Sequence, residues 1–223
     1  MTDDNKPQLS EEDISLIKEA VANRKPIEFY CYTLTPDQKI RFQNILKMFL
    51  EECGQDHLVN CLSYCLLELL DNASKANAKR IFFQENKLDI NNKEDYENGM
   101  KTFRKTITDD THHYMAGLKE GYLQVYLRLS ANDFITLKVL NNTKITNEEK
   151  LRIQQKIENT KNYNTLEDAF KDIDQTEGSG LGIVSIILIL KRLGLDTSHL
   201  NFNTTDNETV ATIKIPIDSF EEL

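Results

Sequence analysis

The chain has 223 residues, of which 39% are hydrophobic and 28% charged, so it is long enough to bury a substantial core and to fold unaided. Its formal net charge of -9 argues against a nucleic acid or an anionic membrane surface as the main partner, because either would select a basic surface. We therefore expect a small molecule or another protein as the partner.

The N-terminus and the cysteines predict a cytoplasmic protein. MTDDNKPQLSEED lacks the basic and apolar regions of a signal peptide, and the longest apolar run, IVSIILIL, is far shorter than the roughly 20 residues that cross a bilayer. Cys31, Cys53, Cys61 and Cys65 show no C-x-x-C pairing, so we interpret them as buried, reduced thiols. Cys61 and Cys65 lie four apart on a predicted helix, which leaves a metal pair as the alternative.

The first half of the chain is predicted to open on a polar tail and to continue into helices. Residues 1–25 are expected to form a polar tail or a loosely attached helix, and residues 26–223 a single domain. PIEFYCYTL has the composition of a strand, and Pro36 opens a helix that runs to about Phe49. A second helix is expected from about Asp56 to Ala78, and a strand at RIFFQ.

The next segments alternate between a helical insertion and strands. A helix within an insertion at about residues 91–120 is predicted because Tyr96, Met100, Phe103 and Ile107 recur at spacings of three and four. YLQVYLRLS and FITLKVLNN alternate apolar and polar residues around the turn AND, which predicts a hairpin.

The last third of the chain contains one strongly apolar helix. Residues 146–176 are polar and carry short helical patterns. A helix is expected from about Leu181 to Leu193, and Gly194 ends it. LNFNTT and TVATIKIPI then form a second pair of strands. Adjacent strand pairs mixed with helices predict an α/β fold in which helices pack on one face of a mixed, mostly antiparallel sheet.

Residues 178–182 read GSGLG and lead into the apolar helix. A dinucleotide-binding turn would need a glycine where Ile183 stands, and a Walker A loop would need a lysine that does not follow. Glycines nevertheless let successive N–H groups turn toward an anion, and the positive end of a helix dipole favours the same ligand. We interpret GSGLG as a phosphate-binding turn. A glycine-rich helix entry required by close packing is the alternative.

The second predicted helix carries a polar stripe on an otherwise apolar surface. Glu68, Asn72 and Lys75 recur at i, i+4 and i+7, so a carboxylate, an amide oxygen and an ammonium group share one face. Mg²⁺ accepts oxygen ligands and bridges nucleotide phosphates, and a lysine neutralises the same phosphates. The stripe predicts a Mg-nucleotide site, with a solvated helix face as the alternative.

Taken together, these segments resemble the Bergerat-fold ATPases, the superfamily of gyrase B subunits, the large heat-shock chaperone, sensor histidine kinases and MutL-type repair proteins. ELLDNASKANA is similar to the family's N box, E-x-x-x-N-A-x-K, and EGSGLGI to its second glycine box. NETVATIKIP is similar to the closing hairpin, and the match runs from about Cys53 to Ile217. The resemblance implies a two-layer α/β sandwich with ATP between the helices and a flexible lid at about residues 146–177.

The resemblance also implies roles for individual residues. Asn72 would hold Mg²⁺, Lys75 would approach a phosphate, and Glu68 would be the catalytic carboxylate that orients a water or an acceptor hydroxyl. Thr209 would lie near the adenine. The backbone N–H groups that would cradle the phosphates belong to Gly178, Ser179, Gly180, Leu181 and Gly182.

One box departs from the family pattern. Where the family places D-x-G-x-G after a strand, this chain has VLNNTKIT, with Asn141 in place of the aspartate and no glycine. An amide oxygen can accept a hydrogen bond from the adenine amino group, but without a negative charge the bond is expected to be weaker. The missing glycines are expected to stiffen the entry to the lid.

We therefore expect a stand-alone ATP-binding module, a protein kinase or ATPase, that phosphorylates or regulates a protein partner in signalling. A nonenzymatic nucleotide sensor or scaffold with a degenerate ATP site is the alternative from another class. A hydrolase that uses nucleotide to clamp two subunits is a third. Fold-level analogy does not decide among them, because one scaffold supports many chemistries.

Overall fold

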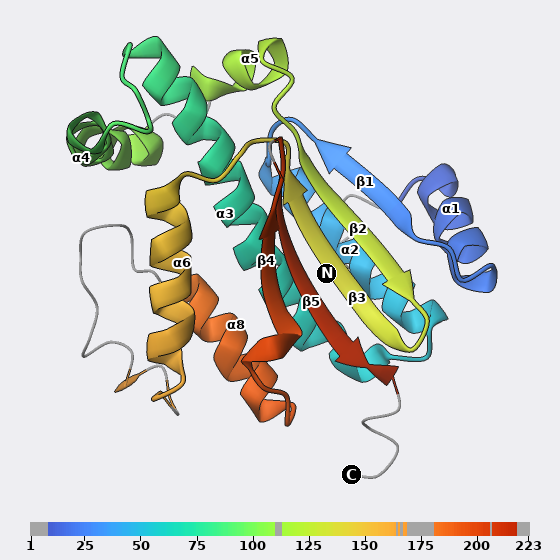
Figure 1. Ribbon diagram of the computed structural model, residues 1–223. Coiled ribbons are helices and arrows are strands. Elements are labelled where there is room, and N and C mark those ends of the chain that lie inside the picture. The colour runs from blue at the N-terminus through green and yellow to red at the C-terminus, as the bar shows by residue number, and fades with distance from the viewer. Residues whose placement is uncertain are drawn as a thin grey trace, which may run out of the picture.

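The computed structural model describes residues 9–109, 113–163, 165, 167–168, 181–205 and 207–217. In this part of the chain, five strands form one antiparallel sheet with the order β1-β2-β3-β5-β4. They are β1 (Ile27–Cys31), β2 (Val125–Ala131), β3 (Phe134–Asn141), β4 (Leu200–Thr204) and β5 (Thr209–Pro216). Helices cover one face of this sheet, so the α/β class with helices on one face is confirmed (Figure 1).

The two hairpins form where the alternation of apolar and polar residues predicts them. β2 and β3 pair antiparallel with Leu127 opposite Val139, and both side chains are buried against the helices. Tyr126 and Arg128 point to the other face of β2, as the period of two along a strand requires. β4 and β5 pair antiparallel in the same way, with Leu200 opposite Ile213.

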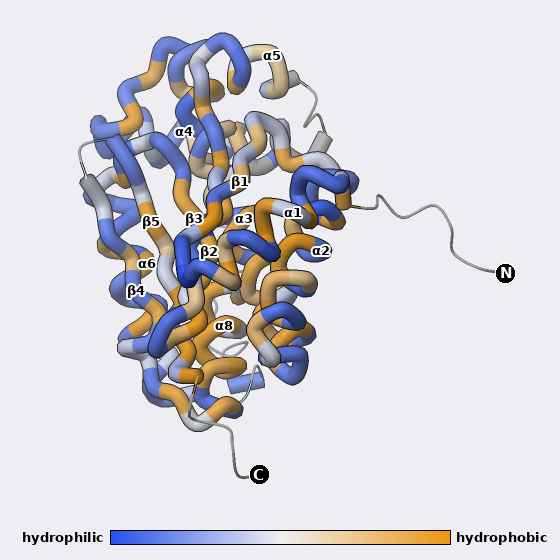
Figure 2. The backbone as a smooth tube through the Cα atoms, turned by 90° about the vertical axis from the view of Figure 1, so that its right-hand side faces the viewer, coloured by the Kyte–Doolittle hydropathy of each residue, from blue (hydrophilic) through white to orange (hydrophobic). Residues whose placement is uncertain are grey.

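Three helices provide most of the core that faces the sheet: α2 (Pro36–Glu52), α3 (Val59–Glu85) and α8 (Leu181–Arg192). A 3-10 turn (Asp56–Leu58) precedes α3, and another (Thr197–His199) precedes β4. Seen from the side, the apolar segments lie between the sheet and these helices (Figure 2). Core residues with no exposed surface are Phe42, Ile45, Leu46, Leu62, Leu66, Ile186, Ile187 and Leu190.

The prediction of a strand at RIFFQ is wrong, because α3 continues through these residues to Glu85. Ala78, Ile81 and Phe82 are buried at spacings of three and four, which is the period of a helix. Aromatic and β-branched residues favour strands on composition alone, but here they pack against helices instead of pairing with another strand.

The helices α4 (Lys93–Asp109) and α5 (His113–Glu120) fold onto the end of α3. They form a second apolar cluster, separate from the core that faces the sheet. The cluster consists of Ala78, Ile81, Phe82, Phe83, Tyr96, Met100, Phe103, Tyr114 and Leu118. The amphipathic spacing in this insertion therefore reflects burial against α3.

The N-terminal segment, expected to be a polar tail or a loosely attached helix, contains the helix α1 (Glu11–Ala22). Ile17 is fully buried in the main core. Asp13 accepts two hydrogen bonds from the guanidinium of Arg41 on α2, at 2.9 and 3.0 Å. Apolar burial and an ion pair thus anchor α1 more closely than the sequence indicated.

The helix α6 (Asn147–Thr160) begins the segment that the family resemblance assigns to a lid. Thr146 and Glu149 form a capping box at its start, which satisfies two N–H groups of the first turn. At its end, Lys191 of α8 donates to the carbonyl oxygens of Thr160 and Tyr163, both at 2.9 Å. The described helices include none that is both long and apolar enough to cross a bilayer.

Candidate functional site

A pocket of about 550 Å³ lies between α3, the inner face of the sheet at β3, β4 and β5, the start of α8, and the helices α4 and α6. It brings together predicted residues from four elements that are far apart in the sequence. Those that line it are Glu68, Asn72, Lys75, Asn141, Gly182 and Thr209. Leu181 does not line it and packs against Tyr163, Val184 and Leu188. Gly178, Ser179 and Gly180 lie outside the described residues.

The polar stripe of α3 faces the pocket while the opposite side of the helix is buried in the core. Asn72 and Lys75 are exposed, and Glu68 is half-buried. Within the described part of the chain, these three side chains have no hydrogen-bond or ion-pair partner. Their carboxylate, amide and ammonium groups line the pocket.

Gly182, in the first turn of α8, lies directly against the carboxylate of Glu68. A Cβ atom at this position would overlap Glu68 Oε2. The glycine thus lets the Glu68 carboxylate lie against the first turn of α8, and a larger residue would displace the end of that side chain. The contact places a negative charge beside the N-terminal turn of a helix, where the helix dipole favours it.

Asn141 is 4% exposed and lies at the end of β3, at the floor of the pocket. The orientation of its amide follows from the hydrogen bonds of its neighbour Asn77. Asn77 Nδ2 donates to the carbonyl oxygen of Gln124 at 3.1 Å, and a carbonyl can only accept, so Asn77 Oδ1 points toward Asn141. Asn141 Nδ2 in turn donates to Asn77 Oδ1 at 3.3 Å and to Thr143 Oγ1 at 2.5 Å. Asn141 Oδ1 is left without a donor among the described residues.

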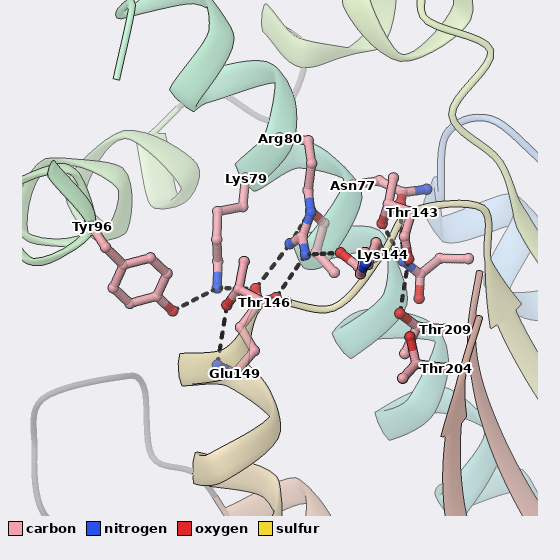
Figure 3. Close-up of polar contacts among 12 residues, drawn as sticks. Asn77, Lys79, Arg80, Tyr96, Thr143, Lys144, Thr146, Glu149, Thr204 and Thr209 are labelled. Atoms are coloured by element: carbon pink, nitrogen blue, oxygen red, sulfur yellow. Dashed lines mark hydrogen bonds and ion pairs between the residues drawn. The ribbon is translucent and has the colours of Figure 1, made fainter. Parts of the chain in front are cut away.

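Thr209 extends the same network from β5. It lies opposite Asn141 in the β3–β5 register, and its hydroxyl donates to the carbonyl oxygen of Thr143 at 2.8 Å. The hydroxyl of Thr143 donates to Asn77 Oδ1 at 3.2 Å (Figure 3). In this network the amide of Asn141 and the hydroxyls of Thr143 and Thr209 donate to oxygens of the network, and no described residue donates to the side-chain oxygen of Asn141.

A cluster of ions closes the other side of the pocket, between α3 and α6 (Figure 3). Glu149 accepts from Lys79 at 2.8 Å and from Arg80 at 2.9 and 2.6 Å. Burial raises the pKa of the Glu149 carboxyl, but the hydrogen bonds and charges of Arg80 and Lys79 outweigh burial and hold the pKa well below its usual range. Glu149 therefore stays ionised at neutral pH.

The charge of the pocket is opposite to that of the chain as a whole. Among the described residues that line it, five side chains are cationic and two acidic, whereas the chain carries a formal charge of -9. The cations are Lys75, Lys79, Arg80, Arg152 and Lys156. Such a pocket favours an anionic ligand, because the net positive charge of its lining attracts negative charge.

Several of these residues could not be predicted from the sequence, for one reason. Asn77, Thr143 and Glu149 belong to three different segments and meet only in the folded chain. The one local signal was the capping box at the start of α6, in which Thr146 and Glu149 are three residues apart. That signal predicts a helix start and says nothing about a pocket.

The cysteines are free thiols. Cys31 and Cys65 are buried, and Cys53 and Cys61 are half-buried, so the predicted burial holds fully for two of them. Burial raises the pKa of Cys31 and of Cys65 to about 12, which keeps both protonated and unreactive at neutral pH. Within the described residues no three His, Cys, Asp or Glu side chains are grouped as a metal site, and the metal pair at Cys61 and Cys65 gains no further ligand.

Comparisons with known proteins add one relative. An uncharacterized protein of Treponema pallidum (strain Nichols) is 35% identical over 207 residues, which cover 92% of this chain and 40% of the relative. The chain thus spans less than half the length of the curated relative that it matches. No family model and no solved structure matches the chain.

Proposed function

We propose that this chain is an ATP-binding module with the Bergerat fold, of the histidine-kinase-like ATPase type, which phosphorylates or regulates a protein partner in cytoplasmic signalling. One observation carries the proposal: six of the motif residues line a single pocket, namely Glu68, Asn72 and Lys75 of α3, Asn141 of β3, Gly182 of α8 and Thr209 of β5. The pocket's cationic lining suits a polyanion such as a nucleoside triphosphate.

The polar network at the floor supports adenine as the base. Asn141 offers an acceptor oxygen that no described residue engages, and adenine carries an exocyclic amino group that can donate to it. Guanine carries a carbonyl oxygen at the corresponding position, which would oppose the oxygen of Asn141. ATP should therefore bind more tightly than GTP.

The α3 stripe supports a Mg²⁺-bound triphosphate. Mg²⁺ usually keeps several waters and is held by one or two protein oxygens together with the phosphates of its substrate, so the lack of a larger ligand group among the described residues is compatible with it. The amide oxygen of Asn72 would hold the ion, which when bound neutralises phosphate charge. Lys75 would contact a phosphate, and Glu68 would accept the proton of an attacking water or hydroxyl.

Calorimetric titration of the full chain with ATP, ADP and GTP, with and without Mg²⁺, tests the proposal. We expect Mg²⁺-dependent binding of ATP that Asn72→Ala abolishes while the fold is retained. Asn60→Ala, an exposed change on the same helix outside the pocket, is the matched control and should leave binding unchanged. Equal ATP binding by the Asn72 variant and the wild type would contradict the assignment.

A nonenzymatic nucleotide sensor is the second candidate. The observation that favours it is the neutral amide of Asn141, which gives the base a weaker acceptor than a carboxylate would. Transfer of phosphate from ATP to a partner protein, lost in Glu68→Gln, would exclude the sensor. ATP binding without hydrolysis or transfer would support it.

A further inference from the structure

The sheet has one face that no described helix covers. Helices pack against the face that carries Leu127 and Val139, and the opposite face is turned toward the viewer in Figure 1. We call this opposite face the open face. Because side chains alternate along a strand, every second residue of the five strands belongs to it. The register places these residues in rows that cross the sheet.

An apolar row crosses four strands of the open face. It consists of Tyr30, Tyr126, Leu140 and Val210, which lie opposite one another in successive strand pairs. Tyr30 is 54% exposed, and the centre of its ring lies 5.8 Å from that of Tyr126 and 6.2 Å from that of Tyr32. Aromatic rings that neighbouring rings hold in place can bury a large area on binding, and they lose little conformational entropy.

The open face also carries the charged residues of the sheet. The five strands contain four of them, Glu28, Arg128, Lys138 and Lys214, and all four belong to this face. Arg128 donates to Glu28 Oε2 at 2.8 and 2.5 Å, so one of the three cations is paired. Within the described part of the chain, Lys138 and Lys214 form no ion pair. The open face is therefore net positive in a chain whose formal charge is -9.

The three cations lie closer together than stability alone would favour. Arg128 lies directly opposite Lys138 in the β2–β3 register, and like charges at such positions are destabilising. Lys214 is the diagonal neighbour of Lys138 across the β3–β5 pair. Uncharged residues at these positions would avoid the repulsion. A group of cations that the fold does not need is expected where a ligand of opposite charge binds.

The apolar row and the cations together select one class of ligand. Arg128 and Lys138 follow the apolar row at about 7 Å along the strands, and neighbouring strands are about 4.8 Å apart. A helix rises about 5.4 Å per turn, so one laid along the apolar row spans the four strands in about three turns. Apolar side chains on such a helix would cover Tyr30 and Tyr126, and carboxylates beside them would reach Lys138. We propose that the open face docks an acidic amphipathic helix of a partner protein.

Other anions fit the open face less well. A compact anion such as inorganic phosphate would satisfy Lys138 but leave Tyr30 against water. A nucleic acid would be attracted by the open face and repelled by the acidic remainder of the surface. The inference goes beyond the proposed nucleotide site, because it adds a docking surface on the opposite face of the sheet. It does not rest on nucleotide binding.

Fluorescently labelled synthetic helices provide the test. The first is an alanine-based peptide of about 18 residues in which leucines form one face and glutamates flank them. In the second peptide lysine replaces each glutamate, and in the third serine replaces each leucine. In anisotropy titrations of the full chain without nucleotide, we expect the first peptide to bind with micromolar Kd. The other two should bind at least about tenfold more weakly.

Variants of the chain test the two rows separately. Lys138→Glu should weaken the first peptide about tenfold, while the urea midpoint should not fall, because the change removes the repulsion with Arg128. Tyr30→Ser, an exposed change, should weaken the same peptide several-fold. Lys47→Glu makes the same charge change at an exposed site on α2. This matched control should leave peptide binding unchanged.

The place of binding can be read from a single tryptophan, because the chain contains none. Tyr30→Trp puts an emitter on the open face, and Tyr64→Trp puts one on an exposed part of α3 in the helix layer. The first peptide should shift the emission of the tryptophan at position 30 to shorter wavelength and leave that at position 64 unchanged.

Four results would overturn the proposal: no binding of the acidic peptide, equal binding of the acidic and basic peptides, full binding by Lys138→Glu, or equal responses of the two tryptophans. Tighter binding of a single-stranded oligonucleotide of about 20 nucleotides would assign the open face to nucleic acid instead. Peptide binding by a chain that does not bind ATP would refute the nucleotide proposal alone. ATP binding without peptide binding would refute the docking surface alone.

Discussion

Glu149 joins α6 to α3 through a largely buried group of charges, and Glu149→Gln measures what that group contributes to stability. Its carboxylate accepts from Lys79 at 2.8 Å, from Arg80 at 2.9 and 2.6 Å, and from the backbone N–H of Thr146 at 2.9 Å. The side chains of Glu149, Lys79 and Arg80 are 11%, 11% and 16% exposed, so water screens them little. Glutamine keeps the shape of the side chain but leaves two buried cations opposite a neutral amide.

The expected loss of stability follows from the two cationic side chains that Glu149→Gln leaves buried. Removing one partner of a buried ion pair costs about 3–5 kcal/mol, because the other charge stays desolvated. Glutamine retains one acceptor oxygen, so we expect the lower end, a loss of about 3 kcal/mol in the free energy of unfolding. For a chain of this length, that loss corresponds to a fall in Tm of about 6–12 °C.

The loss should also depend on pH. Burial raises the pKa of Glu149, but Arg80 and Lys79 lower it further and hold it below its unfolded value of about 4.3. A lowered folded-state pKa stabilises the protein above the unfolded pKa, and this stabilisation is lost as the pH falls through the folded-state pKa. The difference between wild type and Glu149→Gln should therefore be constant near neutral pH and shrink below about pH 4.

Urea unfolding followed by circular dichroism measures this difference. Glu158→Gln is the matched control, because Glu158 lies on the same helix and its pair with Lys161 is exposed, at 70% and 53%. An exposed pair contributes at most about 0.5–1 kcal/mol, so the control should change stability little. Equal losses in the two variants would refute the argument that burial gives Glu149 its effect.

Two further predictions concern the pocket. Asn141→Asp introduces the carboxylate of the motif that the sequence resembles, yet it should lower stability by about 2–3 kcal/mol, because a carboxylate cannot donate to Asn77 and Thr143. Urea unfolding should show a smaller loss in acid, where a protonated carboxyl can donate, and undiminished stability at neutral pH would contradict the network. Gly182→Ala should change stability by less than about 1 kcal/mol, since the end of the Glu68 side chain can rotate away. Calorimetry should show about tenfold weaker Mg-ATP binding, because the displaced carboxylate approaches the phosphates, and wild-type affinity would count against that geometry.

The elements that the sequence predicted well are those whose burial pattern is local. Along most of the β2–β3 hairpin buried residues alternate with less buried ones, so the period of two is visible in a short window. The helix α8 is a nearly continuous apolar run that is buried at six consecutive positions, and the run is visible in the sequence in the same way. The prediction of a strand at RIFFQ was wrong because its three apolar residues fit both the period of a strand and the period of a helix. Contacts of Phe82 and Phe83 with α4 and α5, distant in sequence, decide that α3 continues.

The candidate site was predictable to the extent that its residues share one element. Glu68, Asn72 and Lys75 were found because a single helix sets their spacing. Lys79 and Arg80 follow on the same helix, but their role depends on Glu149, which is about 70 residues away and approaches only when α6 packs beside α3. No spacing rule within α3 predicts that contact.

The surroundings of Asn141 give a reason for an asparagine at this position that the sequence alone does not give. In the sequence this asparagine stands where the motif of the Bergerat-fold ATPases has a carboxylate, and that alone predicts weaker binding of a base. In the structure, the carbonyl of Gln124 forces Asn77 to point its oxygen at position 141, so a donor is required there. A carboxylate would place two acceptors face to face in a buried site, whereas the amide supplies the donor and keeps one oxygen directed elsewhere. The asparagine therefore matches its neighbour on α3, and the residue at position 77 explains why an aspartate would not fit at position 141.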